Sequence, residues 1–377
     1  MLITRSPVRI SFGGGGTDLP VYYERFGGAV LSTAINKYFY TVLRKRDDGK
    51  IQVISSDLRT LETWENIAAM NPERSELEIP LAVVKEVGHD VAIDLFLASE
   101  IPPGTGLGSS ASVCVNVLKA LSAYLHLPLS KYDLAEWAFH IARNVLGNPV
   151  GKQDEYGAVF GGLNYIAFGR NGTVTVEPVE LEPPLLAELQ ENLMLFFTGS
   201  THQSRTILLE QEESTRRDRG RALESLHEIA ALAGRMRAAL LKGDLYAFGT
   251  LLDEGWAAKK RISGRISSGQ IDNMYRIAKE NGALGGKVTG AGGGGFLLLY
   301  CERQNQNAVC EALAAAGARE MTFQFDFKGA QVIVSDPFID GDEHAGGSWQ
   351  FIPNAAAKPA ILQASGGRER PPFHKSL

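Results

Sequence analysis

Glycine is the feature of this sequence that most restricts how the chain can fold. The chain has 41 glycines among 377 residues, roughly 11% against a usual ~7%, and they are clustered. Segments such as Gly13–Gly16 and Gly290–Gly295 are costly in backbone entropy. They are therefore expected where the backbone packs closely against another backbone or a bound ligand.

Length and charge define the broad class of protein. The length exceeds one ordinary hydrophobic core and predicts two domains. The net charge of −5 and the pI of about 5.9 provide no global basic field to hold nucleic acid. No apolar run is long enough to span a membrane, and the N-terminus lacks a signal-peptide core. The scarce cysteines, Cys114, Cys301 and Cys310, favour a reducing compartment, and we expect a cytoplasmic protein.

The first half of the chain mixes strand and helix patterns. Asp47-Asp48-Gly49 predicts a hairpin turn between two strands, 57–76 reads as a polar stretch, and 147–162 reads as a loop. Strands are expected over 1–12, 28–46, 50–56, 91–100, 163–169 and 173–180, and helices over 78–88, from 111 onward and over 131–146.

Glu182-Pro183-Pro184 predicts a domain boundary, after which the pattern restarts. We therefore expect an N-terminal domain over 1–185 and a C-terminal domain over 186–335. Residues 336–377 lack periodicity and predict an irregular tail. The second unit is expected to have strands over 191–199, after 295 and up to about 334, and helices within 203–242, 244–262, 268–281 and 303–317.

The loop from Pro102 to Ser112 carries the strongest functional signal. Its alternate glycines let backbone N–H groups approach a ligand, and the helix that follows directs its N-terminus to the same place. Ser109 and Ser110 add hydroxyls. A Walker loop is excluded because no Lys precedes Ser109, and a dinucleotide fingerprint fails because Ser109 replaces its last glycine. The loop thus predicts a cradle for nucleotide phosphates, with tight helix–strand packing as the alternative.

Three further features have a structural and a functional reading. The glycines of 290–295 suit a tight hairpin or a close approach to a ligand. Asp154 suits a turn former or a general base, and Arg9 suits a solvated strand residue or a charge beside that base. Taken singly, the structural reading is the more common one for Asp154 and Arg9.

The joint occurrence of these segments in order resembles a known family. The chain is similar to the small-molecule kinase superfamily of galactokinase, homoserine kinase, mevalonate kinase and phosphomevalonate kinase, over roughly residues 3–335. Glycines replace the Gly-Glu-His run of galactokinases, and in this the chain resembles D-glycero-D-manno-heptose 7-phosphate kinases. The segments that carry the resemblance are Arg5-Ser-Pro-Val-Arg9-Ile-Ser-Phe-Gly13, Gly16-Thr17-Asp18, Pro103-Gly-Thr-Gly-Leu-Gly-Ser-Ser-Ala111, Gly151-Lys-Gln-Asp154 and Lys287-Val-Thr-Gly-Ala-Gly-Gly-Gly-Gly295.

The resemblance implies an α+β, two-domain small-molecule kinase fold. Its N-terminal unit would be like domain 2 of ribosomal protein S5, with a left-handed β-α-β element, and its C-terminal unit would be ferredoxin-like. The active site would lie between them and use ATP and Mg²⁺. A small-molecule sugar phosphate would be the partner, with no nucleic acid and no membrane, and a homodimer is left open.

The resemblance also implies roles for individual residues. Asp154 would be the catalytic aspartate, with Arg9 beside it, and Ser110, or its neighbour Ser109, would contact Mg²⁺. The ATP-binding residues would be Pro103, Gly104, Gly106, Leu107, Gly108, Ser109, Ser110, Ala111 and Ser112. The substrate-binding residues would be Gly14, Gly15, Gly16, Thr17, Asp18, Lys152, Gln153, Arg205, Lys287, Gly292 and Gly293, of which Lys152, Arg205 and Lys287 would hold a distal phosphate.

One position departs from the family pattern. Mevalonate-kinase-like members carry a Mg²⁺-binding Glu where the alignment places Ala142. Mg²⁺ often keeps several waters, so Ser110, ATP oxygens and water would suffice, with Asp154 or Glu136 as further ligands. Reduced activity is the other reading.

The expected reaction is phosphorylation of the anomeric hydroxyl of a heptose 7-phosphate to a 1,7-bisphosphate. An octose 8-phosphate or a free hexose such as fucose are alternative substrates within the same chemistry. A catalytically silent sugar and ATP sensor is an alternative of a different class, and a dinucleotide-dependent oxidoreductase is weakened by the broken fingerprint.

Overall fold

A computed structural model of the chain describes residues 1–199, 204–217 and 220–335. Residues Met1–Asp336 form one compact unit. The predicted tail, 336–377, lies outside the described residues. Within the described part, no helix is long and apolar enough to cross a bilayer.

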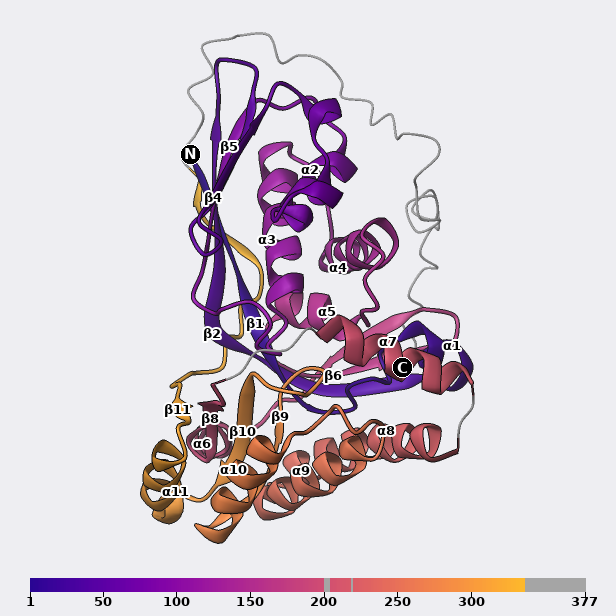
Figure 1. Ribbon diagram of the computed structural model, residues 1–377, viewed down its shortest axis with the longest axis vertical. Coiled ribbons are helices and arrows are strands. Elements are labelled where there is room, and N and C mark those ends of the chain that lie inside the picture. The colour runs from indigo at the N-terminus through magenta and orange to yellow at the C-terminus, as the bar shows by residue number, and fades with distance from the viewer. Residues whose placement is uncertain (200–203, 218–219, 336–377) are drawn as a thin grey trace, which may run out of the picture. The chain divides into compact units, whose positions relative to one another are not determined.

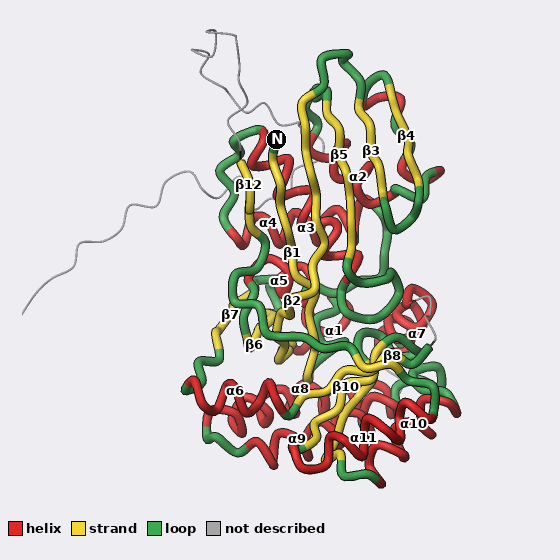
Figure 2. Tube along the Cα trace, turned by 90° about the vertical axis from the view of Figure 1, so that its left-hand side faces the viewer, coloured by secondary structure: helices red, strands yellow, loops and turns green. Residues whose placement is uncertain are grey.

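An eight-stranded sheet is built around two long strands, β1 and β2 (Figures 1 and 2). Its main path runs β12-β1-β2-β5-β3-β4, and β6 and β7 extend it from the first half of β2. Most neighbouring strands are antiparallel, while β3 and β5 are parallel. The strands are β1 (Leu2–Gly13), β2 (Gly28–Lys45), β3 (Ile51–Ser55), β4 (Thr60–Trp64), β5 (Ile93–Ser99), β6 (Leu163–Phe168), β7 (Val174–Pro178) and β12 (Gln331–Ser335).

Four helices lie on one side of this sheet, with α3 and α5 directly against it and α2 and α4 packed on these two (Figure 1). They are α2 (Glu78–Val87), α3 (Ser109–Tyr124), α4 (Lys131–His140), which continues as a π-helical turn over Ile141–Val145, and α5 (Gln153–Phe160). Asn116 of α3 is fully buried against the sheet, where its Nδ2 donates to the Phe39 carbonyl and to Thr41 Oγ1, each at 3.0 Å. Because a buried amide needs such partners, these two hydrogen bonds fix the position of α3 on β2.

A second, four-stranded antiparallel sheet has the order β11-β8-β10-β9 (Figure 1). Every residue of β10, the sequence Phe-Leu-Leu-Leu-Tyr-Cys, is buried, which is why this strand reads as an uninterrupted apolar run. Helix α8 packs on α9 and on β2, and α9 packs on β9, so the two helices together connect the sheets. The strands are β8 (Leu193–Phe197), β9 (Ala283–Val288), β10 (Phe296–Cys301) and β11 (Arg319–Glu320). The helices are α1 (Pro20–Phe26), α6 (Pro183–Glu191), α7 (Ser204–Arg216), α8 (Gly220–Leu241), α9 (Leu245–Lys260), α10 (Gly269–Glu280) and α11 (Arg303–Ala315).

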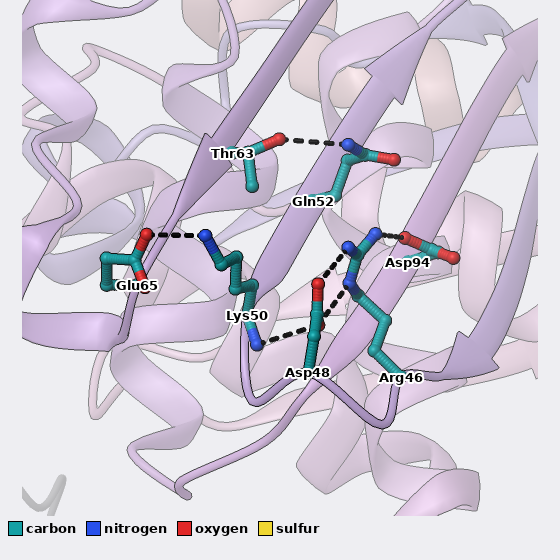
Figure 3. A network of polar contacts seen from close by, with 7 residues as sticks. All are labelled: Arg46, Asp48, Lys50, Gln52, Thr63, Glu65 and Asp94. Carbon is teal, nitrogen blue, oxygen red and sulfur yellow. Dashed lines mark hydrogen bonds and ion pairs between the residues drawn. The ribbon is translucent and has the colours of Figure 1, made fainter.

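The predicted hairpin between the second and third strands is wrong. β2 and β3 do not pair, because β5 lies between them. Figure 3 shows a contact that accompanies this order at the turn, where Arg46 binds the carboxylates of both Asp48 and Asp94 at 2.5 Å. Asp94 belongs to β5, so the arginine holds the turn to the intervening strand. Nearby on the same surface, Lys50 Nζ donates to Glu65 Oε1 at 2.7 Å.

Five elements were not expected from the sequence: α1, α6, β4, α5 and β9. β4 lies in the predicted polar stretch 57–76, since an edge strand tolerates alternating exposed side chains. The predicted loop 147–162 contains α5, whose short length hides its period. β9 precedes the glycine segment 290–295, which is therefore a hairpin connection. The domain boundary at 185/186 stays a prediction. β12 belongs to the predicted C-terminal domain but pairs with β1 of the predicted N-terminal domain.

The connection between β9 and β10 packs directly on the loop that precedes α3. The hydroxyl of Thr289 donates to the Thr105 carbonyl at 3.1 Å. A Cβ built on Gly290 would lie 2.5 Å from the Cα of Gly106, and one built on Gly106 would lie 2.5 Å from the Thr289 carbonyl oxygen. The second sheet thus reaches the first through backbone-to-backbone contact that only glycine permits.

We expect Gly290→Ala to lower the free energy of unfolding by about 1–3 kcal/mol, since the added methyl forces the two loops apart. Gly290 also has a φ of +66°, which disfavours alanine. Urea denaturation measures the change. Gly264→Ala is the control, because no atom lies within 4 Å of its Cβ position, and it should change stability by less than about 0.5 kcal/mol. Equal stabilities of the two variants would contradict the contact.

Candidate active site

A cavity of about 160 Å³ opens where β1, the loop before α3, and helices α5, α7 and α9 meet. Most of the segments singled out in the sequence contribute to its wall. The predicted site residues that line it are Arg9, Gly15, Gly16, Asp18, Gly104, Gly106, Gly108, Ser109, Ser110, Ala111, Gln153 and Asp154. The fold therefore brings together residues from three distant parts of the chain.

The loop before α3 has the geometry of an anion cradle. Gly104, Gly106 and Gly108 all have positive φ, and Gly108 is the N-cap of α3. This turns free N–H groups of the first helical turn toward the cavity, where the helix dipole favours negative charge. The hydroxyl of Ser109 is buried and has no hydrogen-bond partner in the structure, so it can accept or donate to a ligand.

Three of the predicted ATP-binding residues of this loop do not line the main cavity. The Leu107 side chain is fully buried, and its carbonyl accepts a bond from the Arg9 backbone N–H at 2.9 Å. The Ser112 hydroxyl donates to the Pro7 carbonyl at 2.6 Å. Pro103 lines a second cavity of about 230 Å³, which shares Ser109 and Ser110 with the first.

Arg9 holds Asp154 at the cavity wall. The Arg9 Nε donates to Asp154 Oδ1 at 2.8 Å, Nη2 lies 2.6 Å from the same oxygen, and Nη1 donates to the Gly106 carbonyl at 2.8 Å. The Arg9 side chain is 3% exposed, whereas Asp154 is 29% exposed. Asp154 lies in the first turn of α5, so the buried arginine orients a carboxylate that still reaches the cavity.

Asp18 lies in a buried turn of the first glycine segment. Its carboxylate accepts from the Gly16 N–H at 2.8 Å and from the Gln153 N–H at 3.3 Å. Burial raises the pKa of Asp18 above its ordinary value, and the nearby charge of Asp154 adds to the increase. Thr17 instead supports the turn, with its hydroxyl donating to the Gly14 and Ala29 carbonyls.

Several buried polar atoms around Asp18 have no partner. They are Ser11 Oγ, Gln153 Oε1 and Gln211 Nε2, and all three residues line the main cavity. Buried polar groups are normally satisfied, so this end of the cavity is suited to a ligand rich in hydroxyls. Sequence reasoning missed Ser11 and Gln211, because nothing in the pattern of α7 marks Gln211 as facing the loop before α1.

The cations predicted for a distal phosphate are dispersed. Lys152 is buried and binds Glu136 Oε1 at 2.6 Å, away from the main cavity. Arg205 is exposed, and its Nη1 donates to the side chain of Asn148, which lines the cavity, at 2.8 Å. Lys287 lines a small cavity of about 10 Å³ with Gly14.

The second glycine segment meets the main cavity through Gly290 and Ala291, whereas Gly292 and Gly293 pack against Ile266.

One cation at the cavity was not identified from the sequence. Lys259 of α9 is 6% exposed, lines the main cavity and donates from Nζ to the Gly290 carbonyl. The sequence gives no cue for it, because it lies in the last turn of a helix, where solvated lysines are common.

Glu155, next to Asp154, was not singled out in the sequence and is the most isolated charge-bearing group of the site. It is 1% exposed, lines the cavity, and its Oε2 has no partner. Burial raises the pKa of this carboxyl well above its ordinary range, and the charge of Asp154 adds to the effect. Glu136, expected from the sequence as an alternative metal ligand, is already paired with Lys152 and with the Tyr156 hydroxyl.

A divalent cation fits this wall through hard oxygen ligands. The described residues include no cluster of three or more His, Cys, Asp or Glu that could hold a metal. Ala142 lines the cavity without offering a ligand, but the unpartnered oxygens of Ser109 and Glu155 line the same space together with Ser110. Mg²⁺ needs only one or two protein ligands beside phosphate and water, so the donor set is compatible with it.

We expect Glu155→Gln to stabilise the ligand-free protein at pH 7, because the buried carboxyl must take up a proton on folding, whereas the amide is neutral in both states. A carboxyl whose pKa is raised on folding stabilises fully below its unfolded value of 4.5 and loses that contribution as the pH rises through its folded pKa. The gain should therefore shrink as the pH falls toward 4.5. Urea denaturation at several pH values measures it.

Glu136→Gln is the matched control. Its carboxylate accepts from Lys152 and Tyr156, each at 2.6 Å, so its loss should destabilise the protein at pH 7. If the two variants were destabilised alike, Glu155 would have a partner, contrary to the geometry.

Comparison with known proteins identifies the family of this chain. The model of the GHMP kinases N terminal domain matches residues 78–162, and that of the GHMP kinases C terminal domain matches 236–319. The chain is 32% identical to a D-glycero-alpha-D-manno-heptose 7-phosphate kinase of Campylobacter jejuni, over 87% of this chain and 97% of that protein.

Solved structures agree. A D-glycero-D-manno-heptose 1-phosphate kinase from Bacteroides thetaiotaomicron superposes with a TM-score of 0.75 at 29% identity, covering 89% of this chain and all of that one. A putative sugar kinase from Campylobacter jejuni gives 0.72 at 31% identity, covering 88% and 97%. The α+β kinase fold expected from the sequence is thereby confirmed. The chain belongs to the GHMP kinase family.

Proposed function

We propose that the protein is an ATP-dependent kinase for the anomeric C1 hydroxyl of a sugar phosphate, most specifically D-glycero-D-manno-heptose 7-phosphate, giving the 1,7-bisphosphate. The observation that carries the proposal is the juxtaposition in one cavity of a glycine cradle at a helix N-terminus and a carboxylate held by Arg9. The similarity to a heptose 7-phosphate kinase supports the choice of substrate.

The nucleotide would bind across the start of α3. Its phosphates would accept bonds from the N–H groups at Gly106, Gly108 and the first turn of α3. The second cavity, which shares Ser109 and Ser110 with the first, leaves room for the nucleoside. The γ-phosphate would then lie on the side of the loop that faces Asp154.

The transfer needs a base and charge neutralisation. The C1 oxygen of the sugar attacks the γ-phosphorus, the bond from that phosphorus to the β–γ bridging oxygen breaks, and ADP leaves. Asp154 accepts the proton of the hydroxyl, and Arg9 keeps the carboxylate oriented. Bound Mg²⁺ would neutralise phosphate charge; Ser110, Ser109 and Glu155 are the residues that would hold it.

The sugar would occupy the end of the cavity lined by Asp18. Its hydroxyls can satisfy the free polar atoms of Ser11, Gln153 and Gln211. Of the cations predicted for the distal phosphate, Arg205 is best placed, because its partner Asn148 lines the cavity.

The test is an assay of ADP release with a panel of sugars. We expect turnover with heptose 7-phosphate, and phosphorus NMR of the product should show a new anomeric phosphate. Preference for an octose 8-phosphate or for free fucose would reassign the substrate. Absence of ADP release with every sugar, together with retained ATP binding, would indicate the silent sensor.

We expect free heptose to be a poorer substrate than its 7-phosphate by at least about tenfold in kcat/KM, because each lost charge-assisted contact removes on the order of 1.5–3 kcal/mol. Steady-state kinetics with both sugars measure the ratio. Equal efficiency would eliminate a distal phosphate site.

We expect Asp154→Asn to lower kcat by ~10²–10⁴-fold, because the amide cannot accept the proton. Nucleotide affinity, measured by calorimetry, should change little, since Asp154 does not belong to the phosphate loop. Asp90→Asn, in an exposed loop, is the control and should keep full activity. Near-normal turnover of Asp154→Asn would remove Asp154 as the base.

A further inference from the structure

Phosphoryl transfer spreads negative charge over the oxygens of the moving group, and a cation must meet that charge. Arg9 is largely occupied by the protein, with two of its five N–H donors left over. All three of its guanidinium nitrogens already contact protein acceptors, two on Asp154 and one on the Gly106 carbonyl. Arg9 is thus engaged in holding the base and the loop.

Among the described residues, Lys259 is the one other cation that lines the main cavity. It projects from α9, is 6% exposed, and its Nζ donates to the carbonyl of Gly290. Gly290 in turn packs on Gly106 of the phosphate loop. An ammonium has three N–H donors, and the Gly290 carbonyl takes one of them. The remaining donors are available to a ligand in the cavity.

Charged residues of several elements surround Lys259. Arg9 of β1 and Lys287 of β9 repel it, while Asp18 and Asp154 attract it. Helix α8 offers only apolar side chains there, Ile229, Leu232 and Met236. Burial, with a further contribution from Arg9, lowers the pKa of Lys259 to about 8. The ammonium is therefore charged at neutral pH but incompletely compensated by the protein, which suits it to an incoming anion.

We propose that Lys259 is a further catalytic residue, whose ammonium binds the oxygens of the phosphoryl group during its transfer while it remains on the Gly290 carbonyl. The proposal rests on the proposed function. Lys259 keeps its proton throughout: the C1–O–P bond forms, the bond to ADP breaks, and the hydroxyl proton goes to Asp154. The lysine contributes only charge stabilisation that is strongest in the transition state.

The test compares Lys259→Met with Lys260→Met. Lys260, the next residue, has an exposed side chain and pairs with Asp272 at 3.2 Å. We expect Lys259→Met to lower kcat by ~10²–10³-fold, while the affinity for a non-hydrolysable ATP analogue changes less than about threefold. Lys260→Met should retain wild-type kinetics, and Lys259→Arg should recover part of the lost kcat.

The pH profile gives a second readout. In the wild type, kcat/KM should fall as the pH rises through about 8, where the free ammonium loses its proton. The Lys259→Met variant should lack this limb. A profile with the same limb in both proteins would overturn the proposal, and so would a variant that keeps kcat and loses only sugar affinity.

A sugar-independent arm separates this proposal from the proposed function. ADP with Mg²⁺ and aluminium fluoride mimics the moving phosphoryl group, and its binding needs no sugar turnover. We expect the fluoride to increase ADP affinity in the wild type and much less in Lys259→Met, at equal melting temperatures. An equal increase in both proteins would overturn the role of Lys259. Failure of the wild type to phosphorylate any sugar would overturn the proposed function alone.

Discussion

The arrangement of the site depends on Arg9. Its backbone N–H donates to the Leu107 carbonyl at 2.9 Å, and its guanidinium bridges the Gly106 carbonyl and Asp154. One buried residue of the central strand thus aligns the phosphate loop with the helix that carries the base. Gly157 belongs to the same arrangement, since a Cβ there would lie 3.1 Å from the Cβ of Arg9. Any other residue at this position would require α5 or the Arg9 side chain to shift by a few tenths of an ångström.

The cavity holds polar groups that the protein itself leaves incompletely satisfied. Asp18 and Glu155 are buried acids with raised pKa values, and Lys259 is a buried amine with a lowered one. Each of these costs stability in the ligand-free fold. Such shifts gather where charge must be ready for a substrate, and here they surround the point at which the phosphate loop faces Asp154.

Much of the fold followed from local patterns, and the errors have a physical cause. Apolar periodicity located most helices, and the buried run of β10 was visible as a strand. The hairpin prediction at Asp47–Gly49 failed because turn chemistry fixes where a chain bends but not which strand becomes its neighbour. That choice was made by β5, whose Asp94 pairs with Arg46. α5 escaped notice because eight residues show little helical period.

The sequence by itself determined the chemistry of the loops. The alternating glycines before Ser109, and Asp154 with Arg9, identified the family, the phosphate loop and the base, because short motifs carry backbone requirements that residue order alone reveals. Only the tertiary structure decided which other side chains face that wall. Gln211, Glu155 and Lys259 sit on helices whose patterns separate core from solvent. A pattern of that kind cannot say which buried polar residue points into a cavity, because contacts across more than a hundred residues of chain settle it.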